Sequence, residues 1–389
     1  MKIIDVQACV IGRREPHSGG SVWTFVRIYT DEGIYGTGEC NSAAAMASGF
    51  AVKEAILHLK PRLLGVDPLN IAPLYEGLRR SGRYGGTSAP PIIFAITGIE
   101  NALFDLAGKA LGLPVWQLLG GRFRDNIRLY ADCHFGESND PQTWADKALE
   151  VLDEGYNAIK FDVDGTGVGR RDAWNWSVSA QEMSHIVSLV EGVRGAIGSE
   201  IDLAIDCHGQ FDLPSAITLA HALEDLRLLW LEEPVPAENV AAMAQVRASS
   251  STAICTGENQ YTRYDFLDLL QQKATDIIMP DLAKAGGLLE GKRIGELAET
   301  FYVPVAPHNV SSPLGMMSAC HCMAAIPNFL LLEFHGREIS WWEELCDGEK
   351  PFIRNGSMQV SDQPGIGVEL NEDAARKLLW QDDRYFETP

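Results

Sequence analysis

The hydrophobic residues at the start of the chain alternate with polar ones, as they do along half-buried strands. This pattern runs through IIDVQACVI and SVWTFVRIYTDEGIYGTGEC, and the DEG at 31–33 is a turn signal between two such runs. Helical spacing follows and ends at Gly112, with Pro114 just beyond it. The clearest helix carries its apolar face at Ile96, Ile99, Leu103, Leu106 and Ala110. Strands followed by helices in one block of about 115 residues predict a small α+β domain.

Short apolar runs separated by amphipathic helical stretches fill the chain from residue 126 onward. The runs lie at 127–133, 157–163, 201–206, 228–233, 252–258, 276–281, 303–308 and 329–334. Eight short buried strands alternating with helices predict a parallel α/β barrel of TIM type, about 250 residues in size. No helical pattern follows the eighth run, so we expect a modified (β/α)7β barrel whose Pro- and Gly-punctuated tail returns to the N-terminal domain. The predicted segments are a capping domain, the barrel and the returning tail, at residues 1–122, 123–346 and 347–389.

Polar residues end these apolar runs at nearly constant intervals. They are Asp206, Glu232, Glu258, Asp281, His308 and Glu333, at intervals of 26, 26, 23, 27 and 25 residues. One strand and one helix per interval would place all of them on successive strand ends, at the mouth of the barrel where active sites lie. Stability alone does not explain a repeat of polar residues at one structural position.

The first three of these residues are candidates for a metal site. The carboxylates of Asp206, Glu232 and Glu258, coming from adjacent strands at one depth, would repel one another strongly without a cation. Oxygen ligands in that number suit Mg²⁺, which keeps its remaining positions for water or substrate. The alternative is that each acid caps a strand end or pairs with a base. The equal spacing favours one Mg²⁺ per subunit.

Two histidines stand where they could move protons. Asp281 and His308 come from neighbouring strands, so the carboxylate could hold the imidazole and raise its basicity. A structural histidine bonded to a backbone carbonyl is the alternative. His208 follows Asp206 by two residues, and because side chains alternate along a strand the two point the same way. His134 ends the first strand, and whether it is functional stays open.

Basic residues near the mouth could contact a substrate. Lys160 ends the second strand, where it would be a desolvated cation pointing inward or an ion-pair partner of Asp162. The loop GRREPHSGGS carries Arg13 and His17 beside a Gly-Gly pair and is a candidate substrate gate. A second candidate gate, residues 164–177, follows strand two and so lies on the active face. Its GTGVG does not match the nucleotide-binding fingerprints.

Composition limits the partners and the compartment. The net charge of −21 and pI near 4.8 argue against nucleic acid or an anionic membrane as a partner. An anionic substrate would need local positive charge from a metal or from a few Lys and Arg residues. The eight cysteines form no CxxC pair, which favours free thiols in a reducing compartment. No run approaches the roughly 20 apolar residues of a membrane helix, so we predict a cytoplasmic protein.

A set of short motifs at the strand ends resembles the enolase superfamily, specifically its mandelate racemase-like branch. The motifs on strands two to eight are AIKFD, IDCHG, WLEEP, TGEN, MPDLAKAGG, APH and LLLEF. The likeness covers essentially the whole chain, including GIENALFDLAGKALGLPVWQLLGG between cap and barrel. It implies removal of the proton next to a carboxylate, with Mg²⁺ holding the resulting enediolate. Members of this superfamily are commonly homo-oligomers.

The resemblance also implies roles for the matching residues. By match, the metal ligands would be Asp206, Glu232 and Glu258. Glu232 is preferred to its neighbour Glu233 because it keeps the 26-residue interval. The base would be His308, supported by Asp281, and Glu333 would donate a hydrogen bond to the intermediate.

Two features of strands two and three decide between reactions. The racemases of this branch carry Lys-x-Lys on strand two, whereas this chain has Lys-Phe-Asp at 160–162 and so lacks the usual second base. Strand three carries Asp-Cys-His at 206–208, similar to the Asp-x-His of the galactonate and mannonate dehydratases, whose histidine acts as general acid toward the 3-hydroxyl. Lys160 could help to neutralise the substrate carboxylate, and Asp162 could orient it or a hydroxyl.

The leading hypothesis is dehydration of a small-molecule sugar acid, an aldonate or aldarate, to a 2-keto-3-deoxy sugar acid. His308 would take the C2 proton and His208 would protonate the leaving 3-hydroxyl. The alternative on the same scaffold is an epimerase, racemase or cycloisomerase that uses Lys160 as second base. A glycosidase with a carboxylate pair and a sugar-acid binding protein with an inert site are the alternatives from other classes. No spacing argument gives the stereochemistry of the substrate's hydroxyls.

Overall fold

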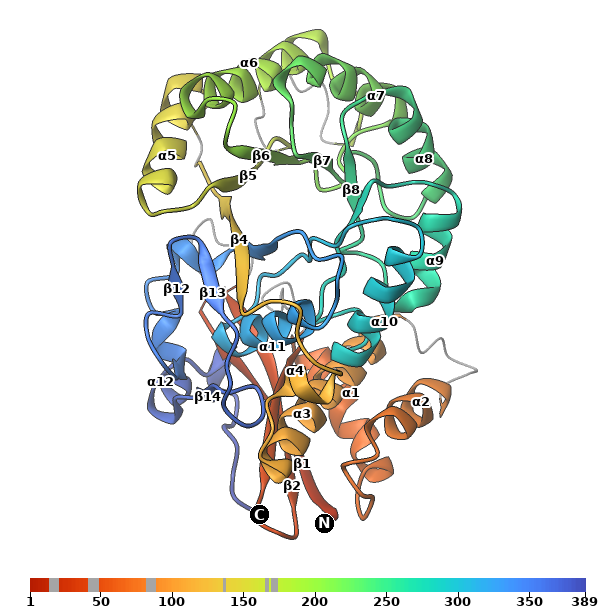
Figure 1. The fold of residues 1–389 in the computed structure, drawn as a ribbon, viewed down its shortest axis with the longest axis vertical. Coiled ribbons are helices and arrows are strands. Elements are labelled where there is room, and N and C mark those ends of the chain that lie inside the picture. Colours follow the sequence, from red (N-terminus) through yellow and green to blue (C-terminus); the bar gives the residue numbers. More distant parts are fainter. Residues whose placement is uncertain (14–20, 41–48, 82–88, 136–137, 165–167, 169–173) are drawn as a thin grey trace.

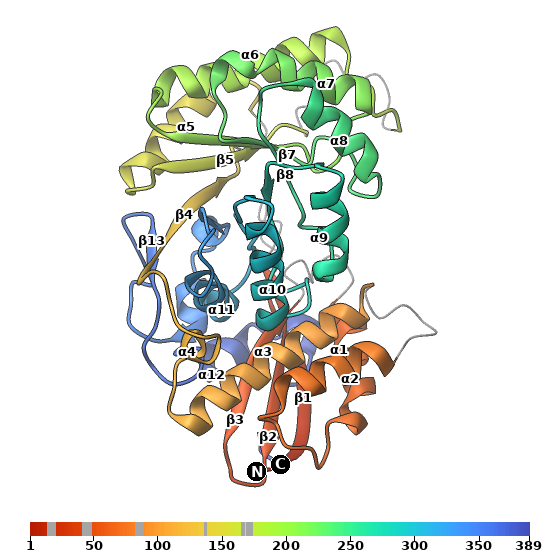
Figure 2. The same cartoon turned by 45° about the vertical axis from the view of Figure 1, so that its right-hand side comes forward.

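The fold consists of an α+β cap and a parallel barrel stacked end to end (Figure 1). The computed structural model describes residues 1–389 except 14–20, 41–48, 82–88, 136–137, 165–167 and 169–173. The two termini lie side by side at the cap end in both views (Figure 2). The predicted fold class, a barrel with an α+β cap, is confirmed.

A three-stranded antiparallel sheet forms the centre of the cap, in the order β1–β2–β3. The cap elements are β1 (Ile3–Gly12), β2 (Val22–Thr30), β3 (Tyr35–Cys40), α1 (Gly49–Leu59), α2 (Ile71–Ser81), α3 (Ile92–Leu111) and α4 (Val115–Leu118). Helix α3 packs directly on β3 because two glycines leave room for its backbone. A Cβ atom at Gly36 would lie 2.2 Å from the carbonyl oxygen of Ala102, and one at Gly38 would lie 2.4 Å from its amide nitrogen. The helix ends at Gly112 with a φ of 67°, as its sequence predicts.

Eight parallel segments close the barrel, each where an apolar run predicts a strand. The named strands are β4 (Asn126–Cys133), β5 (Ala158–Asp162), β6 (Asp202–Asp206), β7 (Trp230–Glu232), β8 (Ile254–Thr256), β9 (Ile277–Ile278) and β10 (Leu332–Phe334). The remaining segment is a bridge at Val305, which pairs with Ile278 on one side and Phe329 on the other. Pro304 and Pro307 have no N–H to donate, which shortens this predicted strand to the bridge. Pairing of β10 with β4 completes the barrel.

Among the described residues, seven helices separate the barrel segments. They are α5 (Pro141–Asp153), α6 (Ala180–Ile197), α7 (Leu213–Ala222), α8 (Val240–Ser249), α9 (Thr262–Gln271), α10 (Leu288–Glu299) and α11 (Pro313–Ala324). Helices α10 and α11 face the cap, whereas α6 and α7 lie at the far end (Figure 1). Between β10 and Cys346 the described chain forms only the 3-10 turns η3 (Gly336–Glu338) and η4 (Glu343–Leu345) in place of an eighth barrel helix, which confirms the (β/α)7β pattern. None of the described helices combines the length and apolar character needed to cross a bilayer.

Apolar side chains fill the barrel axis below the strand ends. This layer consists of Tyr130, Ala158, Ala204, Trp230, Cys255, Ile277, Met279, Ala306 and Leu331. Within this layer the rings of Tyr130 and Trp230 pack edge to face, with their centroids 5.2 Å apart. Because side chains alternate, Asp132 and Glu232 point into the barrel one layer higher, at the mouth. The packed layer is therefore the floor of a polar site.

The C-terminal segment first extends the barrel sheet and then returns to the cap. Its elements are β11 (Cys346–Asp347), β12 (Ile353–Arg354), β13 (Ser357–Gln359), β14 (Glu369–Leu370) and α12 (Glu372–Lys377). Strand β13 pairs antiparallel with β4, and β11 pairs with β14. At the cap, the amide of Gly12 donates to the carbonyl of Leu378 at 2.7 Å, and the amide of Val10 donates to the carboxylate of Asp383 at 2.9 Å. The predicted return to the cap is confirmed.

Two buried carboxylates of the cap hold the starts of two barrel helices. Glu39, at the end of β3, accepts hydrogen bonds from the amides of Ser312 and Gly315 near the start of α11, both at 3.0 Å. Glu100, on α3, accepts from the first two amides of α10 at 2.7 and 2.9 Å. The free amides and positive end of the dipole make a helix N-terminus a favourable partner for a carboxylate. Polar contacts therefore join cap and barrel in addition to apolar packing.

Protonation of these two carboxylates should make the free energy of unfolding depend on pH. Burial raises the pKa of Glu39 to about 7 and that of Glu100 to about 8. Between the ordinary pKa of glutamic acid and these values, the folded state binds protons that the unfolded chain has released. The free energy of unfolding therefore falls as pH rises through this window. We expect Glu100→Gln to make the fall shallower by up to about 1.4 kcal/mol per pH unit, in urea unfolding between about pH 5 and pH 8. Parallel curves for the two proteins would contradict this expectation.

Candidate active site

The predicted strand-end acids lie together at the mouth of the barrel. Strands β6 and β7 pair so that Asp206 stands opposite Glu232, and Asp162 at the end of β5 stands opposite Asp206. Glu333 comes from β10. Asp206 and Glu333 are each 1% exposed, and Glu232 is 0% exposed. Three carboxylates therefore share one space from which water is largely excluded.

The ammonium group of Lys160 lies among these acids. Its Nζ is 2.8 Å from Oδ2 of Asp206, 2.9 Å from Oε1 of Glu232 and 2.8 Å from Oε1 of Glu333. Burial alone would lower the pKa of Lys160, but the three carboxylates raise it well above its ordinary value. The alternative prediction of an ion pair with Asp162 is wrong. The long side chain of Lys160 reaches across the barrel, whereas Asp162 ends the strand one layer higher, near His208.

Replacing Lys160 by methionine should destabilise the protein strongly. The change keeps an apolar stem but leaves three buried carboxylates without their lysine, and breaking one buried pair costs about 3–5 kcal/mol. We expect a loss of this size in the free energy of unfolding by urea, measured in metal-free buffer. A loss below about 1 kcal/mol, as for a surface ion pair, would show that the carboxylates do not depend on Lys160.

The acids predicted as ligands of a divalent cation lie at the mouth of the barrel. Glu258 follows β8, and its Oε2 lies 3.2 Å from Nε2 of His308. The carboxyl groups of Asp206 and Glu232 contact each other, so that burial and the charge of Asp206 raise the pKa of Glu232 well above its ordinary value. Crowded carboxylates of this kind are hard oxygen ligands, which Mg²⁺ prefers. The residues that would hold Mg²⁺ are Asp206, Glu232 and Glu258.

Hydrogen bonds orient two of these carboxylates and turn Glu233 away. The amide of His208 donates to Oδ1 of Asp206 at 2.9 Å, and the indole of Trp230 donates to Oε2 of Glu232 at 2.9 Å. Such bonds to the non-coordinating side of a ligand fix its orientation in metal sites. Glu233, with a φ of 32°, instead accepts from Oγ1 of Thr256 at 3.0 Å and from Nδ2 of Asn259 at 2.9 Å. This geometry agrees with the choice of Glu232 as ligand, which stays a prediction.

His308 stands between Asp281 and the carboxylate cluster. Its Nδ1 lies 2.7 Å from Oδ2 of Asp281, and its Nε2 faces Glu258. Asp281 is itself held by the amide of Ala283 at 2.7 Å and by the ammonium of Lys284 at 3.2 Å. Burial alone would lower the pKa of His308, but Glu258 and further acids raise it above its ordinary value. The structure thus brings together the two residues that the strand spacing predicts as a pair.

Glu333 connects the region of His308 with Lys160. Its Oε2 accepts a hydrogen bond from the amide of Asn309 at 2.7 Å and lies 3.9 Å from Nε2 of His308. Its Oε1 contacts Lys160. Asn309, which sequence reasoning missed, follows His308 directly and also donates its side-chain amide to the carbonyl of Glu333 at 3.2 Å. The carboxyl group of Glu333 is therefore held firmly beside the proposed base.

His208 stands at the open edge of the site. Its φ of 44° is a left-handed conformation, and its side chain is 43% exposed. Nδ1 lies 3.3 Å from Oδ1 of Asp164, and Nε2 lies 3.8 Å from Oδ2 of Asp206. Against the opposing effect of burial, the charges of Asp206 and Asp164 raise the pKa of His208 to about 12. In these surroundings the imidazole is protonated at neutral pH and so carries the proton that a general acid needs. Asp164 begins the predicted gate loop, but no spacing or motif in the sequence singles it out.

His134 lies beside two residues that sequence reasoning missed, Asp132 and His335. The Nε2 atoms of His134 and His335 are 3.0 Å apart, and Nε2 of His335 is 3.5 Å from Oδ2 of Asp132. On its other side, Nδ1 of His134 faces Oδ2 of Asp162 at 3.7 Å. One signal was available, because the Asp-Cys-His that ends strand three also ends strand one.

Two protein-family models match this chain, one over the cap and one over most of the barrel and tail. Residues 18–120 match the N-terminal domain of mandelate racemase / muconate lactonizing enzyme, and residues 143–374 match the enolase C-terminal domain-like model. The chain belongs to the mandelate racemase and muconate lactonizing enzyme family. The resemblance to this branch of the enolase superfamily, inferred from the strand-end motifs, is confirmed.

Members of this family resemble the chain over nearly its whole length. D-xylonate dehydratase of Haloferax volcanii is 41% identical over 387 residues, which cover 99% of this chain and 91% of that protein. D-galactonate dehydratase of Pectobacterium atrosepticum is 33% identical over 358 residues, covering 90% and 89%. A mandelate racemase/muconate lactonizing enzyme-like protein from Rubrobacter xylanophilus has a solved structure with a TM-score of 0.93, at 42% identity over 99% of both chains. Cap and barrel both follow the fold of this family.

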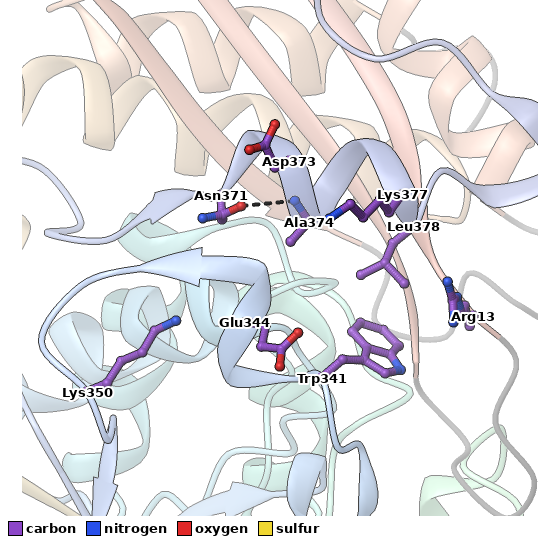
Figure 3. Close-up of a pocket in the computed structure, with 9 residues that line it drawn as sticks. All are labelled: Arg13, Trp341, Glu344, Lys350, Asn371, Asp373, Ala374, Lys377 and Leu378. Carbon is purple, nitrogen blue, oxygen red and sulfur yellow. Dashed lines mark hydrogen bonds between the residues drawn. The ribbon is translucent and has the colours of Figure 1, made fainter.

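Arg13 is one of the two residues predicted to contact the substrate. Arg13 lines a cavity of about 410 Å³ between α12 and the loop that carries Trp341, where Glu344 and Lys377 also lie (Figure 3). None of the strand-end acids is among the described residues that line this cavity. His17 lies outside the described residues. A role of either residue in substrate binding stays a prediction.

Proposed function

We propose that this protein dehydrates a sugar acid, removing the proton at C2 and the hydroxyl at C3 to give a 2-keto-3-deoxy sugar acid. The observation that carries the proposal is the placement of two different histidines around one group of carboxylates. His308 is buried and faces the carboxylates through Nε2, whereas His208 lies at the open edge between two acids. Relatives named D-xylonate, D-galactonate and D-gluconate dehydratase support the proposal.

His308 would take the C2 proton. Its Nδ1 is engaged by Asp281, so Nε2 is the nitrogen with a lone pair directed into the site. The negative charge of Asp281 stabilises the imidazolium that forms, and its bonds to Ala283 and Lys284 keep it in place. Because Nδ1 and Nε2 have different partners, the ring has one orientation for proton transfer.

The negative charge that develops on the substrate must be met by cations. Mg²⁺, held by Asp206, Glu232 and Glu258, would supply positive charge that makes the C2 proton more acidic. Lys160 adds a fixed positive charge in the same space and holds two of these carboxylates in position. We expect one Mg²⁺ per chain, because one group of acids provides these ligands.

His208 would donate its proton to the leaving 3-hydroxyl. As the C3–O bond breaks, the hydroxyl takes this proton and departs as water, and the electrons of the former C2–H bond form the C2–C3 double bond of an enol. The enol becomes the 2-keto acid when C3 takes up a proton and the C2 hydroxyl loses one. Asp164, whose Oδ1 lies 3.3 Å from Nδ1 of His208, keeps the imidazole charged until the transfer.

An epimerase, racemase or cycloisomerase would have to use Lys160 as its second base. The geometry favours elimination instead, because Nζ of Lys160 is in contact with three carboxylates at 2.8–2.9 Å. An isomerase would give a product with the mass of its substrate and would incorporate deuterium from D₂O. A glycosidase would stay active in EDTA, whereas a magnesium-dependent dehydratase would lose its activity.

A panel of aldonic and aldaric acids tests the proposal. Pentonic and hexonic acids come first, because the named relatives act on D-xylonate, D-galactonate and D-gluconate. Each acid is incubated with the full-length protein in Mg²⁺, in EDTA, and in EDTA followed by excess Mg²⁺, and 2-keto acid is measured with semicarbazide. We expect keto acid in both Mg²⁺ samples and none in EDTA. Failure with every acid, together with deuterium incorporation at C2, would favour the isomerase.

A further inference from the structure

A second group of side chains suited to metal binding lies at the mouth of the barrel, beside the proposed Mg²⁺ ligands. Asp132 and His134 lie at the end of β4, and His335 directly follows β10. These strands pair so that Phe334 stands opposite Ala131, which puts His335 next to Asp132. Since side chains alternate along a strand, His134 points to the same side as Asp132. Three potential ligands therefore converge from two neighbouring strands.

The distances within this group fit one ion that contacts all three side chains. The Nε2 atoms of His134 and His335 are 3.0 Å apart, and Nε2 of His335 lies 3.5 Å from Oδ2 of Asp132. Ligand atoms about 2.0–2.1 Å from a zinc-like ion, at right or tetrahedral angles to one another, lie about 2.9–3.4 Å apart. The observed separations are close to this range. A hydrogen bond between the two imidazoles would account for the first separation but not for the approach of Asp132.

Two buried polar atoms of the group lack a protein partner. Asp132 is 8% exposed and His335 is 7% exposed. Within the described part of the chain, Oδ1 of Asp132 and Nδ1 of His335 make no hydrogen bond. A buried carboxylate with so few donors is costly, and a cation in contact with it removes that cost.

The surroundings of His134 also match those of a ligand histidine. Its Nδ1 lies 3.7 Å from Oδ2 of Asp162, so a carboxylate stands behind the ring when Nε2 faces the group. Ligand histidines in metal sites usually have their second nitrogen directed at a carboxylate or carbonyl in this way. The side chain of His134 is 22% exposed, which leaves a path from the mouth of the barrel to the ion.

We propose that Asp132, His134 and His335 bind a second divalent cation, of the class that prefers imidazole nitrogen, such as Zn²⁺ or Co²⁺. Two imidazoles and one carboxylate suit these ions, whereas Mg²⁺ prefers a set of oxygens. The mouth of the barrel thus holds two sites of different chemistry. The first is built from strand ends three to five, and the second from strand ends one and eight. The second site is independent of the proposed dehydration and can be tested without a substrate.

Metal content of the full-length protein tests this proposal. The protein is dialysed against micromolar CoCl₂ in the presence of millimolar MgCl₂, so that Mg²⁺ competes for the oxygen ligands, and both metals are counted by mass spectrometry. We expect one tightly held cobalt per chain in addition to magnesium, with visible absorption bands of Co²⁺ bound to nitrogen ligands. His134→Ala should lose the cobalt and keep the magnesium. Asp162→Asn should weaken cobalt binding by about 10–100-fold.

The second Asp-Cys-His provides a matched control. His208→Ala removes the equivalent histidine at the end of strand three and should keep the cobalt. Wild-type protein that binds no cobalt under excess magnesium would overturn the proposal, whatever the fate of the variants. Retention of cobalt by a folded His134→Ala, or its loss from His208→Ala, would also overturn it. Thermal melting followed by circular dichroism shows which variants are folded.

Discussion

Replacing His308 with asparagine is expected to lower kcat for dehydration of a sugar acid by about 10⁴-fold, at the upper end of the effect of a positioned base. Asparagine keeps a polar side chain beside Asp281 but cannot take a proton. Exchange of the C2 proton with D₂O, followed by NMR, should stop together with keto acid formation, because both begin with the same proton transfer. KM should change little, since the carboxylates that face the substrate remain.

Two further variants separate the base from its surroundings. Asp281→Asn removes the charge behind the imidazole but keeps the imidazole itself, so it should lower kcat by a smaller factor, about 10²-fold. His221→Asn is the matched control, because His221 lies on α7, 50% exposed, with Glu224 at 3.4 Å as its ion-pair partner. It should behave as wild type. Undiminished C2 exchange in His308→Asn would overturn the assignment of His308 as the base.

Replacing His208 with asparagine is expected to separate the two halves of the reaction. Formation of keto acid should fall by about 10³-fold, within the range for loss of a general acid. Exchange of the C2 proton should continue, because His308 and the carboxylates are untouched. The backbone amide that donates to Asp206 is also retained. The measurement is the ratio of deuterium incorporation at C2 to keto acid release, which should rise steeply relative to wild type.

The control for this variant is Asp164→Asn. It removes the acid at 3.3 Å from Nδ1 but leaves Asp206 to hold the charge on His208, so its effect should be smaller. Unchanged keto acid formation in His208→Asn would exclude His208 as the acid. Equal loss of exchange and dehydration would show instead that His208 is needed for the arrangement of Asp206.

The positions of the barrel strands could be predicted because each is a short apolar run with a polar residue at or near its end. Their lengths could not be predicted from this pattern. The run at 276–281 yields only Ile277–Ile278 as β9, and Pro280, which lacks an N–H, lies just beyond. Apolar character predicts burial, whereas strand length also depends on which backbone groups are available for pairing.

The spacing of strand ends predicts which residues meet on neighbouring strands. It does not predict the contacts that form when the barrel closes. His134 and His335 are 201 positions apart and meet only because β10 returns to β4. The partners of Lys160 likewise depend on how far its side chain reaches over the apolar floor. Arg13 was expected at the mouth from its loop alone, but its place at a cavity beside α12 depends on the path of the tail. Contacts between segments so far apart in the sequence cannot be predicted from the spacing of neighbouring residues.

The return of the tail to the cap has a consequence for synthesis of the chain. Strand β1 is translated before the barrel, yet its outer edge obtains partners from Leu378 and Asp383, beyond α12. Domains of a nascent chain generally fold from the N-terminus onward. Here the amides of Val10 and Gly12 cannot form these hydrogen bonds until the barrel and the start of the tail have been synthesised. An open strand edge can pair with other chains, so this protein must keep one of its own edges protected throughout translation.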